Sequence, residues 1–209
     1  MLELYYRDRA IVVCEKPRGV LSEGESADAM PPLLAEALGE SEHGKKPTVY
    51  AVHRLDRETE GIMVYALTAS AAAALSAQMA AREVHKEYIA EVHGTPEPRE
   101  GRLEDLLFFD RTRNRSYIVS RPRRGVKEAA LCYRVLSSEN GISRVAVRLE
   151  TGRTHQIRVQ FASRKMPLVG DRKYGAPASG KALSLRACYL SFSHPVSGEQ
   201  MAFGESLFK

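Results

Sequence analysis

The chain has 209 residues, of which 44% are hydrophobic and 27% are charged, a balance typical of a folded protein and not of a disordered one. Its 31 Lys and Arg residues against 26 Asp and Glu residues give a formal net charge of +5, which fits an anionic partner without identifying one. The longest strongly apolar stretch, Ile62 to Leu67, is far shorter than the about 18 residues that a membrane-spanning helix needs. The start of the chain has neither the basic nor the apolar region of a secretory signal, so we expect a cytoplasmic protein.

The first half of the chain alternates short apolar runs with polar loops. The runs rich in β-branched and aromatic residues are predicted as strands: 10–15, 61–67 and 86–93. The connections rich in Ser, Glu, Gly and Pro are predicted as loops: 16–19, 22–32, 44–47 and 94–98. One helix is predicted from Pro31 to Leu38, because proline is favoured in a first helical turn. A second helix over 69–82 contains eight alanines and neither Gly nor Pro, with Thr68 as its N-terminal cap.

Short strands dominate the second half of the chain. Predicted strands over 129–137 and 142–150 flank Asn140-Gly141, a residue pair typical of a two-residue β-hairpin turn. Apolar residues at helical spacing predict a helix over 154–164. The last runs with strand character are 183–193 and 200–203. No repeat or compositional break divides the chain, so we expect one α+β domain over residues 1–209, built on a largely antiparallel or mixed sheet.

Asp56 is the first candidate for chemistry. It lies in the polar segment His53-Arg54-Leu55-Asp56, shortly before the predicted strand over 61–67. A carboxylate between a loop and a buried strand is a frequent position for a catalytic group, and equally for a turn or capping Asp. The residues alone leave both interpretations open.

Two further candidates follow along the chain. Residues 151–158 combine Arg153, His155, Gln156 and Arg158 near the start of a predicted helix, a position that favours anions. The competing interpretation is a capped helix with solvated arginines. Tyr88, on the predicted strand over 86–93, has the half-buried core position of many strand aromatics as its simpler explanation.

One basic segment carries seven positive charges, more than the net charge of +5 of the whole chain. Seven basic residues lie within 17 positions that contain no acid and have Tyr117 in the middle: Arg111, Arg113, Arg115, Arg121, Arg123, Arg124 and Lys127. Such a run is commonly a solvated face. A flexible basic stretch with an aromatic residue is also how proteins hold single-stranded or flipped nucleotides. We therefore favour contacts of these arginines to a nucleic-acid backbone.

Metal and cofactor chemistry have no local signature in this chain. The six histidines show no HxxxH or HExxH spacing, and the three cysteines form no CxxC pair. Phosphate-binding GxxxxGK[ST], dinucleotide-binding GxGxxG and hydrolase GxSxG patterns are absent as well. We expect neither a metal nor a cofactor, which also argues against a metal-dependent nuclease.

Taken together and in order, these segments resemble the RluA family of pseudouridine synthases. His53-Arg54-Leu55-Asp56, followed by Thr59 and Gly61, resembles the family's signature, and 152–159 resembles its second long motif. Shorter matches follow the family's order: Lys16-Pro17-Arg18-Gly19, Lys86-Glu87-Tyr88-Ile89-Ala90, Gly170-Asp171, Tyr174-Gly175 and Leu183-Ser184-Leu185. The resemblance extends from about Tyr6 to Phe203, and we expect no S4-type RNA-binding domain before it.

The resemblance implies a pseudouridine synthase fold: an extended, mixed and mostly antiparallel sheet in two subdomains, with flanking helices and a central active-site cleft. It implies isomerisation of uridine in structured RNA, rRNA or tRNA, without cofactor or metal, and we expect a monomer. Asp56 matches the catalytic aspartate, Tyr88 the tyrosine that packs against the target base, and Arg158 the arginine that pairs with the aspartate. The remaining expected substrate contacts are His53, Arg54, Leu55, Arg153, His155, Gln156, Leu183 and Leu185.

The chemistry of isomerisation suits these residue types but leaves choices open. The target base must leave the stack and enter a pocket, where an aromatic face can hold it. An ionised Asp56 could act as nucleophile at C1′ or as base at C2′, and Tyr88 could stack or also move the C5 proton. Glu60, Gln160 and Arg186 depart from the family pattern, which weakens inference about the RNA target. The alternative function is a catalytically silent RNA-binding or chaperone protein of the same fold.

Overall fold

The computed structural model describes residues 2–39 and 45–208, so Gly44 of one predicted loop lies outside the described residues. The chain forms two compact units. Unit 1 consists of Met1–His85 and Ala187–Glu205, and unit 2 consists of Lys86–Arg186 and Ser206–Lys209. Across residues 2–39 and 45–208, no helix is long and apolar enough to cross a membrane.

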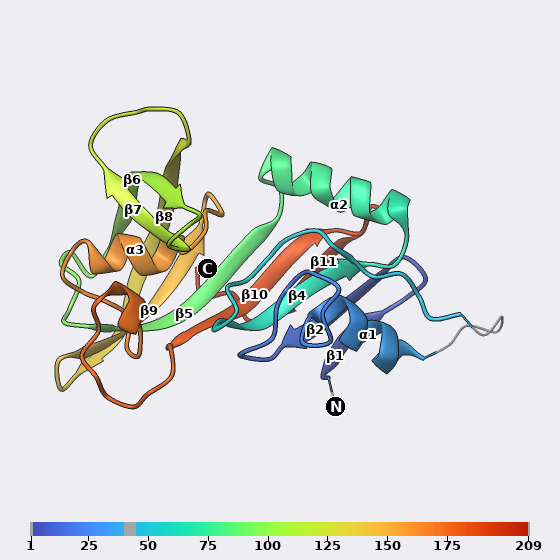
Figure 1. The fold of residues 1–209 in the computed structure, drawn as a ribbon, viewed down its shortest axis with the longest axis horizontal. Helices are drawn as coiled ribbons and strands as arrows, with labels where there is room; N and C mark the ends of the chain where they lie inside the picture. The colour runs from blue at the N-terminus through green and yellow to red at the C-terminus, as the bar shows by residue number, and fades with distance from the viewer. Residues whose placement is uncertain (1, 40–44, 209) are drawn as a thin grey trace. The chain divides into compact units, whose positions relative to one another are not determined.

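Unit 1 is built around a β-sheet (Figure 1). Its strands are β1 (Leu4–Arg7), β2 (Ile11–Lys16), β3 (Tyr50–Ala51), β4 (Glu60–Ala66), β10 (Leu185–Ser193) and β11 (Gln200–Gly204). The order is β1-β2-β4-β10, with β3 on β4 and β11 on β10. The pairs β1–β2, β2–β4, β3–β4 and β10–β11 are antiparallel. Strands β2 and β4 are buried along almost their whole length, which explains why both read as unbroken apolar runs.

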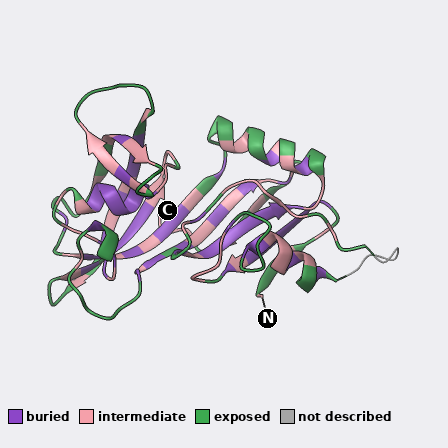
Figure 2. Cartoon of the chain, in the orientation of Figure 1, coloured by how far each residue is buried: buried purple, intermediate pink, exposed green. Residues whose placement is uncertain are grey.

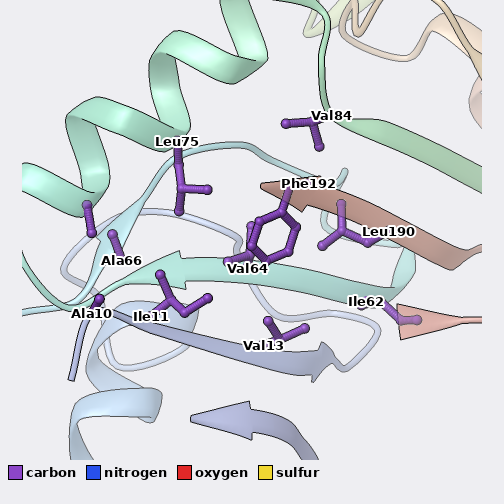
Figure 3. Packing of buried hydrophobic residues seen from close by; sticks show 11 residues of the cluster. Ala10, Ile11, Val13, Ile62, Val64, Ala66, Leu75, Val84, Leu190 and Phe192 are labelled. Atoms are coloured by element: carbon purple, nitrogen blue, oxygen red, sulfur yellow. The ribbon is translucent and has the colours of Figure 1, made fainter. Parts of the chain in front are cut away.

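The helices of unit 1 follow from their apolar spacing. Helix α1 (Met30–Leu38) buries Met30, Leu34 and Leu38, which lie four residues apart on one face. Helix α2 (Ala69–Ala81) starts at the predicted cap, since the Thr68 side chain accepts a hydrogen bond from the backbone N–H of Ala71. Figure 3 shows the core against which α2 packs. Its labelled side chains are Ala10, Ile11, Val13, Ile62, Val64, Ala66, Leu75, Val84, Leu190 and Phe192.

Unit 2 is an antiparallel sheet with helical segments packed on it. Its strands are β5 (His85–His93), β6 (Glu100–Asp110), β7 (Arg115–Val119), β8 (Val126–Glu139) and β9 (Ile142–Leu149), in the order β5-β9-β8-β6-β7. Helix α3 (Gln156–Ala162) and the 3₁₀ helix η1 (Arg172–Tyr174) follow. Val159 and Tyr174 from these helices pack with Leu107 and Ala129 of the sheet. Figure 2 shows buried residues along the strands and exposed ones in the loops.

The α+β prediction is confirmed, and most predicted elements lie within a residue or two of the observed ones. In the predicted hairpin, Asn140 and Gly141 have φ values of 51° and 74°, the left-handed conformation that such a turn requires. Helix α3 begins at Gln156 instead of residue 154, because His155 has φ 54° and is not helical. The basic segment 111–127 is not one flexible stretch, since β7 and the start of β8 lie within it. Strands β1, β3, β6 and β7 and the helix η1 were not predicted.

Candidate active site

Asp56 lies on the connection between β3 and β4 in unit 1 and is half-buried. The backbone turns directly after it, with the N–H of Thr59 donating to the Asp56 carbonyl at 3.0 Å. Asp56 therefore occupies the turn that the simpler interpretation expected. Its backbone carbonyl closes that turn.

The buried Leu55 anchors the Asp56 loop. The Ser22 hydroxyl donates to the Leu55 carbonyl at 2.8 Å and accepts the Leu55 N–H at 2.9 Å. The Ser22 carbonyl in turn accepts the hydroxyl of Tyr65 at 3.0 Å, and that tyrosine is fully buried on β4. Leu55, predicted as a substrate contact, thus has a structural role beside Asp56.

Lys16 holds the other side of the same loop. Its side chain is 0% exposed, and its ammonium donates to the carbonyls of Pro17 (2.8 Å), Val20 (2.8 Å) and Arg57 (3.2 Å). The Arg57 carbonyl also accepts the Gly19 N–H at 2.8 Å. Burial lowers the pKa of Lys16 from 10.5 to about 8, against the opposing effect of nearby carboxylates that include Asp56. The residue after Asp56 is therefore tied to the end of β2.

The neighbours of Asp56 are also engaged. The Nε2 atom of His53 accepts the backbone N–H of Val64 at 3.1 Å, so that nitrogen carries no proton and the ring orients the loop against β4. Arg54 is exposed and pairs with Glu23 at 2.9 Å. Farther along, Gly61 has φ 130°, and a Cβ there would lie 2.2 Å from the Ala187 carbonyl oxygen. Strand β4 can lie this close to β10 because position 61 carries no side chain.

Tyr88 lies in the middle of β5 in unit 2 and is buried, with Val147 of β9 as its partner in register. Its neighbour Glu87 is buried too and binds the end of the chain. The Glu87 carboxylate accepts the Ser206 hydroxyl at 2.9 Å and the Leu207 N–H at 2.6 Å. Tyr88 is therefore fixed by the sheet, and the adjacent Glu87 anchors the C-terminal segment.

Arg158, the third residue of α3, is held by a second acidic residue. Its Nε and Nη2 atoms donate to the two carboxylate oxygens of Asp171 at 2.7 and 2.8 Å. The Arg158 side chain is 7% exposed and the Asp171 side chain 0%, so this is a buried, bidentate ion pair. The guanidinium also lies 5.2 Å from the centre of the Tyr174 ring. Because Asp56 belongs to the other unit, its pairing with Arg158 stays a prediction.

The other predicted residues around the start of α3 are engaged within unit 2. Gln156 donates to the Ala130 carbonyl at 3.0 Å and accepts the Arg153 N–H at 3.0 Å, which shapes the loop that enters the helix. Arg153 donates through Nε to the Glu128 carbonyl at 2.9 Å. His155 is buried, with its Nδ1 atom 2.9 Å from the Tyr174 hydroxyl.

The remaining predicted contacts fall into two groups. Leu183 and Leu185 are buried, as an apolar wall requires. The basic segment is mostly exposed, and its exposed arginines are Arg111, Arg113, Arg121, Arg123 and Arg124. Arg123 lies over the Phe108 ring at 4.9 Å, and the half-buried Arg115 lies over Tyr174 at 5.0 Å. Both arginines use aromatic rings as supports for their charge.

Four residues of the candidate site had no role assigned from the sequence: Lys16, Ser22, Asp171 and Tyr174. Lys16, Asp171 and Tyr174 stood within the short motifs of the family resemblance, and a charged residue at the end of a buried strand is a usable signal for a structural ammonium. Ser22 carries no such signal. Within the described ranges 2–39 and 45–208, no group of three or more His, Cys, Asp or Glu side chains is arranged to hold a metal ion.

Comparison with known proteins decides the family. A family model described as RNA pseudouridylate synthase matches residues 10–163, more than half of the chain. The chain belongs to the RNA pseudouridylate synthase family. It is similar to the dual-specificity RNA pseudouridine synthase RluA of Salmonella typhimurium, with 33% identity over 97% of this chain and 91% of the relative. It is 35% identical to the ribosomal large subunit pseudouridine synthase D of Xanthomonas campestris, over 95% of this chain and 63% of that protein.

Solved structures agree with this assignment. The structure of Human RNA Pseudouridylate Synthase Domain Containing 4 matches with a TM-score of 0.79 and 26% identity, covering 98% of this chain and 88% of that one. The expected pseudouridine synthase fold is therefore confirmed, as is the expected activity of this synthase, isomerisation of uridine in RNA. The catalytically silent alternative is not favoured.

Proposed function

We propose that this pseudouridine synthase modifies one or more uridines in structured rRNA or tRNA, with Asp56 as the catalytic carboxylate. The observation that carries this assignment is the anchoring of the Asp56 loop from both sides, by Ser22 at Leu55 and by Lys16 at Arg57. A catalytic group must be held in place before substrate arrives, and a loop tied at both neighbouring residues meets that need.

The proposed reaction conserves the composition of the nucleoside. The bond between N1 of the base and C1′ breaks, the base turns over, and a bond between C5 and C1′ replaces it. N1 gains a proton and C5 loses one, so neither oxidant nor reductant is required. Ionised Asp56 acts on the ribose, either by attack at C1′ or by removal of the C2′ proton.

Tyr88 and Arg158 complete the proposed catalytic set. A flipped uracil needs a flat apolar surface to replace the stacking it has lost, and the Tyr88 ring is such a surface. Arg158 carries a charge that is independent of pH in the working range, and a guanidinium is suited to orient a carboxylate through two parallel hydrogen bonds. Burial of both side chains on the framework of unit 2 supports fixed roles for them.

RNA recognition is assigned to exposed positive charge and to the loops that enter the site. We propose that the arginines of the basic segment 111–127 contact phosphates, and that Arg54 and Arg153 contact the RNA near the target. Arg54 pairs with Glu23 on the surface, an ion pair weak enough for a phosphate to replace. We further propose a cytoplasmic monomer that needs no metal, in which case chelator leaves turnover unchanged.

The test uses the hydrogen that isomerisation removes from C5. Total RNA labelled with [5-³H]uridine, taken from cells lacking the gene, should release tritium with the wild-type protein. Asp56→Asn should release none while its affinity for RNA stays within about twofold. Glu83→Gln, which removes an exposed carboxylate of the same unit just after α2, is the control and should be active. Tritium release by Asp56→Asn at the wild-type rate would reject the assignment.

Cells that lack the gene also serve to identify the RNA target. Pseudouridines mapped in total RNA with and without the gene should differ at the modified positions, and complementation with wild type but not with Asp56→Asn should restore them. Sites restored by Asp56→Asn would contradict its catalytic role.

A further inference from the structure

Arg158 and Asp171 form a buried ion pair that the proposed reaction does not by itself explain. The Asp171 carboxylate accepts hydrogen bonds from the Nε and Nη2 atoms of the Arg158 guanidinium, at 2.7 and 2.8 Å. These two atoms form one edge of the planar group, so its other edge is directed away from Asp171. The pair therefore converts a flexible cation into one with a fixed direction.

Asp171 is itself held by backbone contacts. Its N–H donates to the Leu168 carbonyl at 3.0 Å, and its carbonyl accepts the N–H groups of Tyr174 at 3.1 Å and Ala176 at 3.0 Å. The preceding Gly170 has φ 78°, and a Cβ there would lie 2.1 Å from the Ala182 carbonyl oxygen. The turn that carries Asp171 thus depends on a glycine, because a side chain at position 170 would clash with the Ala182 backbone.

Tyr174 closes the arrangement from a second side. Its ring lies 5.2 Å from the guanidinium carbon of Arg158. Its hydroxyl accepts the backbone N–H of Ser116 on β7 at 2.8 Å and lies 2.9 Å from His155 Nδ1. The ring under Arg158 is therefore tied to the sheet and to the residue that precedes α3.

Stability alone is a weak reason for such a pair. Removing two charges from water costs several kcal/mol per ion in general, and apolar residues of similar size are often at least as stable. The Asp171 carboxylate contacts only one edge of the Arg158 guanidinium. The pair is therefore better explained by the need to orient Arg158 for its proposed catalytic role. This reasoning rests on the proposed role of Arg158.

We propose that Asp171 is a positioning residue of this synthase, which fixes the direction of the Arg158 guanidinium for the catalytic step. Asp171 acts through Arg158 and touches neither uridine nor ribose. Its loss should therefore slow isomerisation without weakening RNA binding. In addition, once Arg158 can no longer form the bidentate contact, loss of Asp171 should have little further effect on the rate of isomerisation.

The experiment measures single-turnover tritium release, RNA affinity and thermal stability for full-length variants, with [5-³H]uridine-labelled total RNA from cells lacking the gene. Asp171→Asn keeps the size of the side chain and removes its charge. We expect its rate to fall at least tenfold while its Kd stays within twofold. The double variant with Arg158→Lys should be no slower than the slower single variant, because residues that act as a unit are not additive.

Asp105→Asn is the matched control, since Asp105 pairs with Arg164 at 2.9 Å just after α3. It should lower the thermal midpoint and leave the rate within twofold of wild type. If Asp171→Asn does not fold, Asp171→Glu, which keeps the charge one methylene farther out, takes its place with the same expected slowing and the same double variant.

The outcomes separate two failures. If Asp171→Asn (or Asp171→Glu in its place) keeps the wild-type rate, or if its effect multiplies with that of Arg158→Lys, the positioning role is wrong. If Asp56→Asn remains fully active, the proposed catalytic assignment is wrong, whatever the result at position 171.

Discussion

Replacement of Lys16 by methionine tests whether a buried ammonium holds the Asp56 loop. Methionine is unbranched and only one atom shorter than lysine, and it removes the three hydrogen bonds to the carbonyls of Pro17, Val20 and Arg57. The Arg57 carbonyl keeps a donor, because the Gly19 N–H also reaches it at 2.8 Å. The substitution therefore leaves the Pro17 and Val20 carbonyls without this donor and removes one of the two hydrogen bonds that hold the Asp56 loop at the Arg57 carbonyl.

The expected loss of stability at neutral pH is modest because two effects oppose each other. Two carbonyls that lose their donor cost about 2–6 kcal/mol together if no water replaces it, and less where water does. The lowered pKa of Lys16, about 8 against 10.5, means that burial of the charge costs about 3 kcal/mol, which methionine does not incur. We expect Lys16→Met to lose about 1–2 kcal/mol, with a fall of at least tenfold in single-turnover rate because the loop is no longer fixed.

The pH dependence has a definite sign. Between pH 8 and 10.5 the unfolded chain binds more protons at Lys16 than the folded chain, because folding lowers this pKa. Stability from this group therefore rises with pH in that window. From pH 7.5 to 9.5 the stability difference between wild type and Lys16→Met should widen by about 2 kcal/mol. Activity of the wild type should fall over the same range, since a neutral amine has one donor fewer for the three carbonyls.

Urea unfolding at pH 7.5 and 9.5, together with tritium release, measures both effects. Lys181→Met, at an exposed position, is the control and should change neither quantity. A stability difference that narrows toward pH 9.5 would refute the reasoning about the buried charge. A variant that is destabilised but fully active would refute the link between Lys16 and the Asp56 loop.

Three further predictions concern other parts of the chain. Gly61→Ala should cost at least about 3 kcal/mol or prevent folding, measured by urea unfolding, because its Cβ would lie 2.2 Å from the Ala187 oxygen at φ 130°. Asp8→Asn should destabilise the protein near neutral pH and much less at pH 3. Burial raises the pKa of Asp8, but hydrogen bonds from two backbone N–H groups and from His194 outweigh it and lower the pKa, so its contribution is lost as pH falls. Filter binding between 50 and 300 mM salt measures how strongly RNA affinity depends on salt. Replacing Arg121, Arg123 and Arg124 together by Gln should reduce the slope of log affinity against log salt by about 2. The control variant Arg7→Gln/Arg9→Gln should leave that slope unchanged.

Local chemistry in the sequence was enough to predict most secondary structure. Eight alanines without Gly or Pro predict α2, and Asn140-Gly141 predicts the hairpin, since each depends on neighbours in the chain. The strands β6 and β7 were missed because the apolar run of β6, Leu106 to Phe109, follows a charged stretch, and because β7 is a short strand inside the basic segment. Arginines over aromatic rings support β7 and its neighbours, and such contacts are not visible as periodicity.

The sequence by itself determined the family, and with it the reaction and the candidates Asp56, Tyr88 and Arg158, because ordered motifs preserve residue types along the chain. The tertiary structure decided what holds these residues. Lys16 binds the carbonyl of Arg57, 41 positions away, and Arg158 binds Asp171 across 13 positions. Neither separation follows a helical or strand period, so no pattern predicts them. A charge loses its water only when the chain folds, and it must then be compensated by a nearby group. Which group is nearby depends on the course of the folded backbone and not on separation along the sequence.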